Sequence, residues 1–316
     1  KGCKKSVTDI GDRKKAIKTA IKELKPNEIL LVAGKGHEET QDYGNKVINF
    51  SDKKVIKETI HKRKFFLEKS YYHDLLLKKT FNSNDIKNIN YNGVSINTKT
   101  IKKNNLFFAI RGKYTDGHKF VKDAIMKGAI KSIISKETKQ FSKNKIIKVK
   151  STFSSLNSLA KVTRENSYAK IIGITGSVGK TTLKNLISFA LNNYGKVYHS
   201  PYSYNNKFGV PLSLSNLKRN TEYGIFEIGM DKKGEINSLS KIVKPEIAII
   251  TNISGAHFKN FNTLKDIAKA KAEIIDNILD DGYLILNKDD KFFSFLSNKA
   301  RLKKINVISF SSRKNA

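Results

Sequence analysis

The chain has 316 residues, enough for two or three domains of ordinary size, and its hydrophobic content of 39% can supply each of them with a core. Its formal net charge of +33 comes mainly from lysine spread along the whole chain, so nucleic acid and polyanionic small molecules such as nucleotides are equally good partners. The single cysteine, Cys3, excludes an internal disulfide and fits a reducing cytoplasm, and no run of about 20 apolar residues is available to span a membrane.

The first elements predict the end of an α/β domain. Apolar residues recur at helical spacing over residues 12–24, with Asp12 as the N-cap. Residues 28–33 (EILLVA) predict a buried strand that ends in a polar glycine loop. A second helix is expected from residue 51 to about 63, and the charged stretch 61–70 is typical of a connector.

The pattern starts again near residue 71. It predicts a helix over residues 71–79, strands at 93–97 and 106–110, a helix over 118–129, and strands at 131–135 and 145–149. These elements indicate a small mixed α/β domain that ends near residue 150.

A third group of elements begins with a strand over residues 169–175, followed by a glycine loop and a helix over 181–194. Further strands are expected at 223–229, 246–252, 282–287 and 305–310. Because these strands alternate with helical stretches, we expect a parallel, doubly wound sheet.

Residues 173–182 (GITGSVGKTT) carry the strongest local signal, since they lie between a predicted strand and a predicted helix. Backbone amides and a helix N-terminus suit phosphate oxygens there, Lys180 can reach the β- and γ-phosphates, and Thr181 can bind Mg²⁺. The usual GxxxxGK[ST] spacing requires glycine where this chain has Ile174, and the glycine is displaced to Gly176. A glycine-rich turn that binds no ligand is the alternative.

The displaced glycine is informative because TGSxGKTT resembles the loop of the Mur ligase and folylpolyglutamate synthetase superfamily. Other segments resemble the MurF branch of the Mur ligases as a set; they are residues 94–98, 105–112, 116–118, 205–212, 227–230, 234–236, 251–257 and 270–273. The first 60 residues resemble the C-terminal end of the MurE branch, through IGDRKKAI, AGKGHExxQ and FSD.

This resemblance implies a fold class and a domain order. We expect a remnant of a Rossmann-like MurE C-terminal domain at 1–62, a linker at 63–70, a small UDP-binding α/β domain at 71–150, and a doubly wound ATPase domain at 151–316. Since the chain also lacks a starting methionine, we expect a fragment of a MurE–MurF fusion without the MurF C-terminal domain, inactive by itself.

The implied activity is that of a cytoplasmic, ATP- and Mg²⁺-dependent ligase of peptidoglycan synthesis. Such an enzyme adds D-Ala-D-Ala to UDP-MurNAc-tripeptide through an acyl phosphate, and other peptidoglycan enzymes are conceivable partners. Catalysis of the first step, phosphorylation of the peptide carboxylate, would come mostly from positioning the reactants and neutralising phosphoryl charge.

The resemblance implies catalytic roles for Lys180, His257 and Lys271, the last matching the family lysine that can carry a carbamate. Lys269 competes with Lys271, but the two side chains point about 200° apart on a helix, so only one can face the metal. The implied metal ligands are Thr181, Glu227 and His257. The implied nucleotide contacts are Thr175, Gly176, Ser177, Val178, Gly179, Lys180, Thr181, Thr182, Asn287 and Asp290.

The implied substrate contacts are Ser95, Asn97, Thr98, Asp116, Gly117 and His118 for the UDP-sugar, and Asn205 and Asn206 beside the γ-phosphate or substrate. The family commonly has an aspartate and an arginine where this chain has Asn97 and Lys99. In the N-terminal remnant, Gly34 and Glu38 match positions that hold the incoming amino acid in the MurE branch, and His37 is expected to be structural.

Each role has a plain structural alternative: a solvated strand end for Glu227, a polar loop residue for His257, a surface lysine for Lys271 and a turn for Asn287 and Asp290. Two other functions compete with the ligase. A folylpolyglutamate synthetase would lack the small domain with its NTK and DGH segments. A nucleic-acid-binding ATPase would suit the charge, but no interleaved aromatic and basic motif and no recognition-helix signature is present.

Overall fold

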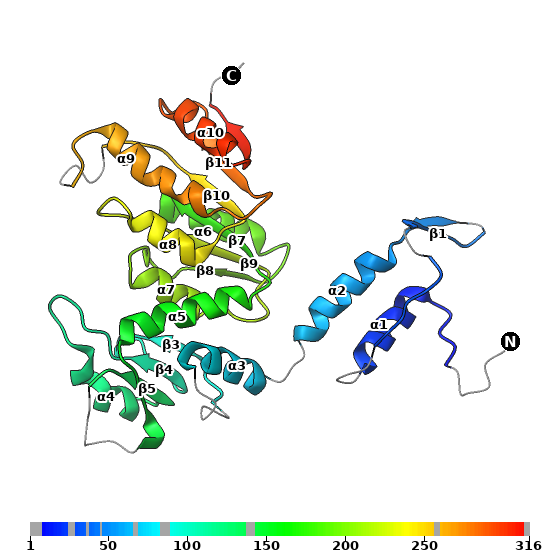
Figure 1. The fold of residues 1–316 in the computed structure, drawn as a ribbon, viewed down its shortest axis with the longest axis horizontal. Helices are drawn as coiled ribbons and strands as arrows, with labels where there is room; N and C mark the ends of the chain where they lie inside the picture. Colours follow the sequence, from blue (N-terminus) through cyan, green and yellow to red (C-terminus); the bar gives the residue numbers. More distant parts are fainter. Residues whose placement is uncertain are drawn as a thin grey trace. The chain divides into compact units, whose positions relative to one another are not determined.

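Contacts divide the chain into two compact units, residues 1–69 and 70–316, and Figure 1 shows the helices and strands of both. Among the described helices, none is long and apolar enough to cross a membrane. The computed structural model describes residues 8–24, 29–35, 38–44, 46–65, 69–82, 89–136, 143–255 and 260–312.

The first unit contains a helix pair and a hairpin. The Asp12 carboxylate accepts the Lys15 amide at 2.6 Å, which confirms the predicted N-cap. The two helices pack on each other around a small core that includes Ile17, Ile21 and Val55. Its described elements are α1 (Arg13–Glu23), β1 (Thr40–Asp42), β2 (Val47–Asn49), which pairs antiparallel with β1, and α2 (Asp52–Phe65).

The strand predicted over residues 28–33 is wrong for its described part, residues 29–33. Leu30 and Val32 pack against the core of the first unit, but Ile29 is 95% exposed and Leu31 is 86% exposed. Among the described residues, no strand pairs with this segment. An extended segment becomes a strand only when a neighbour binds its N–H and C=O groups, so apolar residues alone do not produce one.

The second unit begins with a four-stranded parallel sheet in the order β3-β4-β5-β6. On one face Leu106 and Ile133 pack with Leu76 of the preceding helix, and on the other face Phe107 packs with Val121. This α/β arrangement confirms the predicted class. Its elements are α3 (Lys69–Phe81), β3 (Gly93–Ser95), β4 (Asn105–Phe108), η1 (Gly117–Phe120), α4 (Val121–Met126), β5 (Lys131–Ile134), η2 (Lys143–Lys145) and β6 (Ile146–Lys148).

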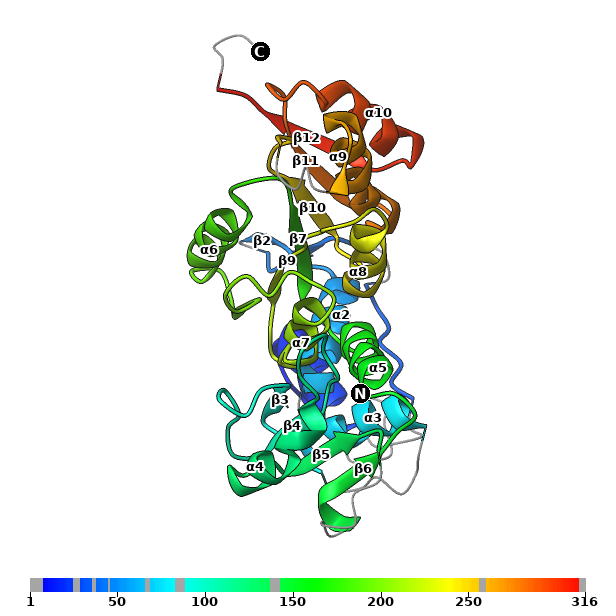
Figure 2. The same ribbon diagram turned by 90° about the vertical axis from the view of Figure 1, so that its left-hand side faces the viewer.

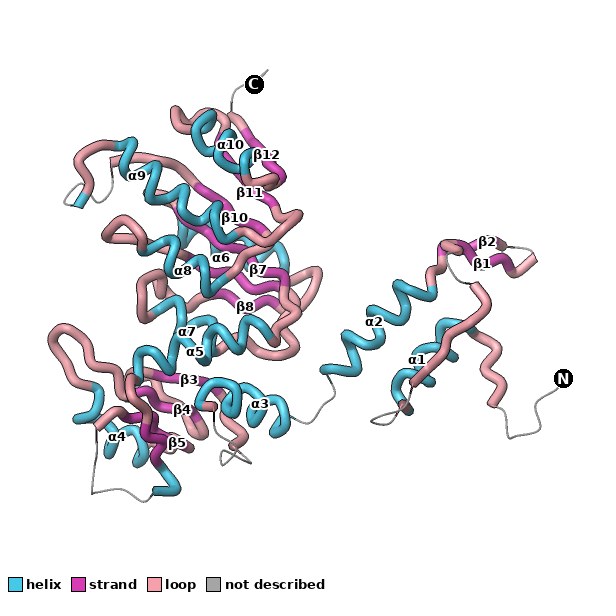
Figure 3. Tube along the Cα trace, in the orientation of Figure 1, coloured by secondary structure: helices cyan, strands magenta, loops and turns pink. Residues whose placement is uncertain are grey.

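The larger sheet of the same unit has six parallel strands in the order β12-β11-β10-β7-β9-β8, so the predicted doubly wound sheet is confirmed. Figure 3 traces its strands in magenta between cyan helices. Its elements are α5 (Thr152–Glu165), β7 (Lys170–Thr175), α6 (Lys180–Leu191), β8 (Val197–His199), α7 (Gly209–Ser215), β9 (Tyr223–Glu227), α8 (Glu235–Val243), β10 (Ile247–Ile250), α9 (Leu264–Lys271), η4 (Ala272–Asn277), β11 (Tyr283–Asn287), α10 (Phe293–Leu302) and β12 (Asn306–Phe310).

Helices cover both faces of this sheet, as Figure 2 shows edge-on. On one face α6 packs Leu183 and Ile187 against Ile174 and Ile225. On the other face the main core gathers apolar side chains of α7, α8, α9 and α10. Because both faces are buried, the central strands are almost continuously apolar, which is why the sequence predicts them well.

The strand order reverses at β7, because the chain runs from β7 to one edge and later returns to place β10 on its other side. In open α/β sheets ligands bind beyond the carboxyl ends of the strands at such a switch point. The loops after Thr175 and after Ile250 lie there.

Polar side chains join the small sheet to the helices α5 and α7, which pack beside the larger sheet. Asn216, which follows α7, accepts the Val94 amide and donates to the Val94 carbonyl, both at 2.9 Å, in the manner of a neighbouring strand. Thr152 at the start of α5 donates to the Ala109 carbonyl at 3.0 Å. The small sheet is thereby fixed beside α7, the helix that follows the 200–208 segment.

Candidate functional site

A glycine loop connects β7 to α6. Gly176 and Gly179 have φ angles of 143° and 84°, which side-chain-bearing residues rarely adopt. A Cβ on Gly176 would lie 1.8 Å from the Thr251 hydroxyl, so the displaced glycine is required where the loop meets the end of β10. Ser177 joins these loops further, since its amide donates to the Asn252 carbonyl at 3.0 Å and its hydroxyl to the Ser254 carbonyl at 2.9 Å.

Lys180 is the first residue of α6, and its ammonium lies over the loop. It donates to the carbonyls of Gly176 at 2.9 Å and Ser177 at 3.2 Å. Burial lowers the pKa of Lys180, and the negative charge of Glu227 opposes that shift. This arrangement suits phosphate oxygens, because it combines a helix N-terminus with a glycine loop and a lysine bound to the loop carbonyls.

The other loop residues named from the sequence lie around this centre. Thr175 is fully buried at the end of β7, and its hydroxyl has no hydrogen-bond partner among the described residues. Val178 is 58% exposed, and its carbonyl accepts the Thr251 hydroxyl at 2.7 Å. Thr182 is exposed.

Glu227 ends β9 and is 1% exposed. Its carboxylate accepts the Thr181 hydroxyl at 2.7 Å through one oxygen and the Asn205 side-chain amide at 2.7 Å through the other. The Lys184 ammonium lies 3.9 Å from the same carboxylate. The structure therefore brings Thr181, Glu227 and Asn205, all named from the sequence, into direct contact.

The oxygen atoms of this cluster fit a magnesium ion bound together with a nucleotide. Mg²⁺ prefers oxygen ligands, keeps several waters and is usually held by one or two carboxylates plus substrate phosphates. Glu227 and Thr181 supply a buried carboxylate and a hydroxyl directly beside the glycine loop of residues 176–180, the candidate phosphate loop. Within the described ranges, no group of three or more His, Cys, Asp or Glu side chains is arranged to hold a metal ion.

Lys271 ends α9 and is 2% exposed, whereas Lys269 is exposed, so the helix turns Lys271 and not Lys269 into the unit. Burial, with a smaller effect of the nearby positive charge of Lys180, lowers the pKa of Lys271 to about 7. A partly neutral amine beside a phosphate loop has chemistry that a solvated lysine lacks.

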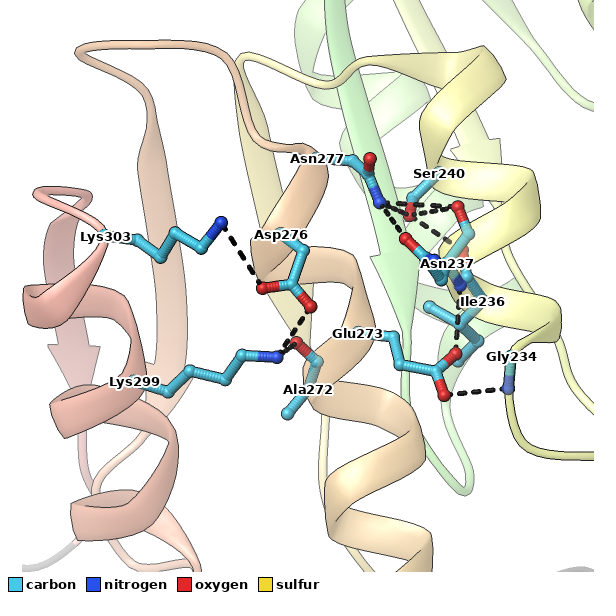
Figure 4. A network of polar contacts seen from close by, with 10 residues as sticks. All are labelled: Gly234, Ile236, Asn237, Ser240, Ala272, Glu273, Asp276, Asn277, Lys299 and Lys303. Atoms are coloured by element: carbon cyan, nitrogen blue, oxygen red, sulfur yellow. Dashed lines mark hydrogen bonds and ion pairs between the residues drawn. The ribbon is translucent and has the colours of Figure 1, made fainter.

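Figure 4 shows how the segment after Lys271 is fixed. The Glu273 carboxylate accepts the amides of Gly234 at 2.8 Å and Asn237 at 3.0 Å, which caps the N-terminus of α8. On the other side, Asp276 pairs with Lys299 of α10 at 2.8 Å. These contacts hold η4 between two helices and so fix the position of Lys271.

Asn287 and Asp290 lie at the end of β11. Both carboxylate oxygens of Asp290 accept backbone amides, one from Ile253 at 2.7 Å and one from Phe292 at 2.9 Å. The Asn287 side-chain oxygen accepts the Asp289 amide at 2.9 Å. Asp290 thus connects this turn to the loop after β10, beside the phosphate loop.

A cavity of about 500 Å³ lies between the small sheet and the 204–212 segment. Its lining includes four of the residues named from the sequence, Asn97, Thr98, Gly117 and Asn206, together with Lys99 and Tyr204. Ser95 is 4% exposed and lines a neighbouring cavity of about 700 Å³, where its hydroxyl donates to the Asn97 carbonyl at 2.9 Å.

Asp116 and His118 use their polar atoms within the protein. The Asp116 carboxylate lies 2.6 Å from the His118 Nδ1 and accepts the Lys136 ammonium at 2.8 Å, and these partners lower the pKa of Asp116. The other ring nitrogen of His118 accepts the Ser135 amide at 3.0 Å. These bonds fix the turn that carries Gly117, where a Cβ would lie 2.7 Å from the Ile110 backbone.

Gly34 and Glu38 lie in the first unit. Gly34 has a φ of 118°, and a Cβ there would lie 3.3 Å from the Arg13 guanidinium, which binds Asp52 at 2.6 Å. Glu38 pairs with Lys35 at 2.8 Å. His37 lies outside the described residues.

His257, expected to be both catalytic and a metal ligand, also lies outside the described residues. Lys184 is a polar residue of the site that sequence reasoning missed. The only signal in the sequence is its helical spacing, one turn after Lys180, and its burial beside Ser188 appears only in the structure.

Comparison with known proteins identifies two domains. Residues 90–171 match the catalytic domain of the Mur ligase family, and residues 174–316 match the Mur ligase middle domain. The UDP-N-acetylmuramoyl-tripeptide–D-alanyl-D-alanine ligase of Rickettsia prowazekii is 42% identical over 229 residues, which are 72% of this chain and 51% of that protein. The Bacillus subtilis ligase of the same name is 35% identical over 199 residues, 63% of this chain and 44% of that protein.

Two solved structures resemble this fold at similar identity. MurF from Acinetobacter baumannii superposes with a TM-score of 0.67 at 28% identity, covering 76% of this chain and 52% of that one. MurF from Thermotoga maritima in complex with ADP gives a TM-score of 0.62 at 29% identity, covering 72% and 52%. The chain spans about half the length of the curated relatives it matches.

Proposed function

Since this chain belongs to the Mur ligase family, we propose that it forms the UDP-substrate and ATP-binding portion of a ligase that joins D-Ala-D-Ala to UDP-MurNAc-tripeptide in the cytoplasm. The observation that carries the proposal is the contact of Thr181 with Glu227 beside the phosphate loop, combined with a cavity of about 500 Å³ in the same unit. The names of the relatives support the choice of substrates.

In this proposal the phosphate loop binds ATP, and Lys180 turns from its loop carbonyls to the β- and γ-phosphates. When bound, Mg²⁺ would neutralise phosphoryl charge, and Thr181 and Glu227 would hold it, with His257 as a further candidate. The exposed Val178 and Thr182 border the nucleotide, and Asn287 with Asp290 lies where the adenosine would end.

The chemical step has two parts. A carboxylate oxygen of the tripeptide attacks the γ-phosphorus and ADP leaves, after which the amine of D-Ala-D-Ala attacks the carbonyl carbon and phosphate leaves. Lys180 neutralises charge on the transferring phosphoryl group. The buried Lys271, whose pKa is about 7, lies near Lys180. Asn205 orients the Glu227 carboxylate from the substrate side.

For the UDP-substrate we propose the cavity of about 500 Å³, a volume typical of small-ligand sites. Asn97, Thr98 and Lys99 would bind the pyrophosphate and sugar, and Asn206 would meet the peptide arm. Ser95, Asp116 and His118 would act through the turns they fix, since their polar atoms already bind protein partners.

We also propose that residues 1–62 are the end of a MurE-type ligase fused to a MurF-type one, with 63–70 as linker and a domain boundary near 150. Support comes from the separate compactness of residues 1–69 and from the motifs IGDRKKAI, AGKGHExxQ and FSD in the first 60 residues. Gly34 and Glu38 would then have served the amino-acid site of the preceding enzyme. The parent gene on both sides of this segment tests the fusion directly.

A product assay tests the ligase proposal. The chain and the full-length protein of its gene are each incubated with MgATP, UDP-MurNAc-tripeptide and D-Ala-D-Ala, and product mass and released phosphate are measured. We expect product from the full-length protein and none from this chain alone. The acyl phosphate and the amine must meet within about 3–3.5 Å, and we expect the MurF C-terminal domain, which this chain lacks, to be needed to hold the amine. Absence of product from the full-length protein contradicts the assignment.

A further inference from the structure

Lys184 is the buried charge of the site to which the mechanism gives no role. It lies in α6, one turn after Lys180, and is 1% exposed. Its ammonium donates to the Ser200 carbonyl at 2.9 Å and to the Tyr202 carbonyl, and it lies 3.9 Å from Glu227. An ammonium is costly to bury unless each of its donors is satisfied. These three partners satisfy the donors of Lys184, so its burial is a specific structural contact.

The segment that Lys184 holds, residues 200–208, lines both cavities of the unit. Tyr204 and Asn206 line the cavity of about 500 Å³, and Pro201, Tyr202 and Tyr204 line the cavity of about 700 Å³. The same segment sends Asn205 to the Glu227 carboxylate. It contains no strand and precedes α7, so side-chain contacts hold it together with a few backbone bonds, such as the one from the Gly229 amide to the Asn205 carbonyl at 2.8 Å.

The backbone of this segment also carries strain at the tethered residue. Tyr202 has a φ of 47°, a left-handed conformation that costs a residue with a side chain about 1 kcal/mol or more. The Tyr202 side chain is 77% exposed, and its ring lies 5.9 Å from the ring of Tyr204. The turn bond from the Tyr204 amide to the Pro201 carbonyl and the bond from Lys184 to the Tyr202 carbonyl both offset the cost of the strained conformation.

We propose that Lys184 is a positioning residue that fixes the 200–208 segment to the phosphate-loop helix, so that nucleotide and UDP-substrate bind cooperatively. A ligand that orders α6 and Glu227 also orders the cavity wall, because Lys184 contacts both. The coupling depends on the function proposed above, whereas the tether itself is a property of the free protein.

The tether is tested without any ligand by hydrogen–deuterium exchange. Lys184→Met keeps the length of the side chain but removes its donors, and the amides of residues 202–208 should exchange about tenfold faster. Lys184→Arg, which keeps charge and donors, should restore most of the protection. The matched control is Lys170→Met, an exposed lysine at the start of β7, which should leave exchange unchanged. Unchanged exchange in Lys184→Met overturns the proposal.

If Lys184→Met does not fold, Lys184→Gln provides the second test. Glutamine keeps a polar side chain in the buried position but is shorter and uncharged, so the charge-assisted bonds to the Ser200 and Tyr202 carbonyls are weakened and the same amides should exchange faster. Exchange as slow as in the wild-type chain contradicts the tether.

The coupling is tested by titrating MgADP into the chain with and without saturating UDP-MurNAc-tripeptide. We expect the substrate to tighten MgADP binding by about fivefold or more in the wild-type chain and in Lys170→Met, and to have almost no effect in Lys184→Met. Binding of neither ligand to the wild-type chain rejects the proposed function and leaves the exchange result to decide on the tether. Binding of both without coupling, or coupling that persists in Lys184→Met, overturns this inference alone.

Discussion

The hydroxyl of Thr181 donates to the carboxylate of Glu227 over 2.7 Å and so joins the first turn of α6 to the end of β9. This pair forms only when β7 and β9 lie side by side in the sheet. It places a buried carboxylate beside the candidate phosphate loop, where it could bind a cation that accompanies a nucleotide.

Lys180→Ala should weaken MgADP binding by about 100-fold, because charge-assisted contacts to phosphate are lost. The fold should remain, since the ammonium binds loop carbonyls and no other element. Calorimetric titration measures affinity and circular dichroism checks the fold. Unchanged affinity in a folded variant rejects the phosphate-loop assignment.

Glu227→Gln should make nucleotide binding nearly independent of Mg²⁺, because an amide keeps the size of the side chain but loses the charge that favours the cation. The matched control is Glu222→Gln, an exposed residue just before the same strand. Titrations of ADP with and without Mg²⁺ compare the two variants. A Mg²⁺ dependence that survives in Glu227→Gln removes Glu227 from the metal site.

Lys271 predicts a pH-dependent stability, since its pKa is about 7 in the folded chain and 10.5 when unperturbed. Below pH 7 both states hold the proton and the cost of burying the charge is fully present. Between pH 7 and 10.5 the unfolded state binds more protons, so the stability contribution rises with pH by up to about 1.4 kcal/mol per unit.

The comparison of unfolding free energies between the wild-type chain and Lys271→Met should therefore shift in favour of the wild type as pH rises from 7 to 10. Lys269→Met, which removes an exposed lysine two residues away, should show no such trend. Denaturant unfolding at several pH values measures both. Parallel pH curves for wild type and Lys271→Met would rule out a depressed pKa.

Glu273→Ala should destabilise the second unit by about 1–2 kcal/mol, because the Gly234 and Asn237 amides at the start of α8 lose their acceptor. Glu273→Gln should cost less, since one amide oxygen still accepts. Because the side chain also fixes η4, Glu273→Ala should speed amide exchange around Lys271 as well. Equal stability of wild type and Glu273→Ala would contradict the cap.

Much of the fold was predictable because it depends on local patterns. The strand, loop and helix around Gly176 follow one another in sequence, and the buried strands of the parallel sheet are short apolar runs. By contrast, the strand predicted at residues 28–33 was wrong over its described part, residues 29–33, since strand formation needs a pairing partner that a local pattern does not reveal. The three-residue strand β8 and the helix α5 were missed, although Leu156, Leu159 and Ala160 of α5 follow helical spacing.

The site was predictable in its parts and not in its connections. Thr181, Glu227 and Asn205 were named separately, but only the sheet order brings β7 beside β9 and so joins them. Helix geometry predicted that only one of Lys271 and Lys269 faces the site, and the structure buries Lys271 and exposes Lys269. The role of Lys271 stays a prediction. Lys184 was missed because lysine is common throughout the chain, and its burial comes from tertiary packing.

The most direct test of the central claim is a calorimetric titration of the 316-residue chain with UDP-MurNAc-tripeptide, repeated in MgADP and compared with duplex DNA and single-stranded RNA over a range of salt concentrations. The ligase account predicts saturable binding of the UDP-substrate and of MgADP, with nucleic acid bound weakly and without sequence preference. No heat from either small ligand, together with tight nucleic-acid binding that falls steeply with salt, would contradict it and assign the charge of +33 to a nucleic-acid partner.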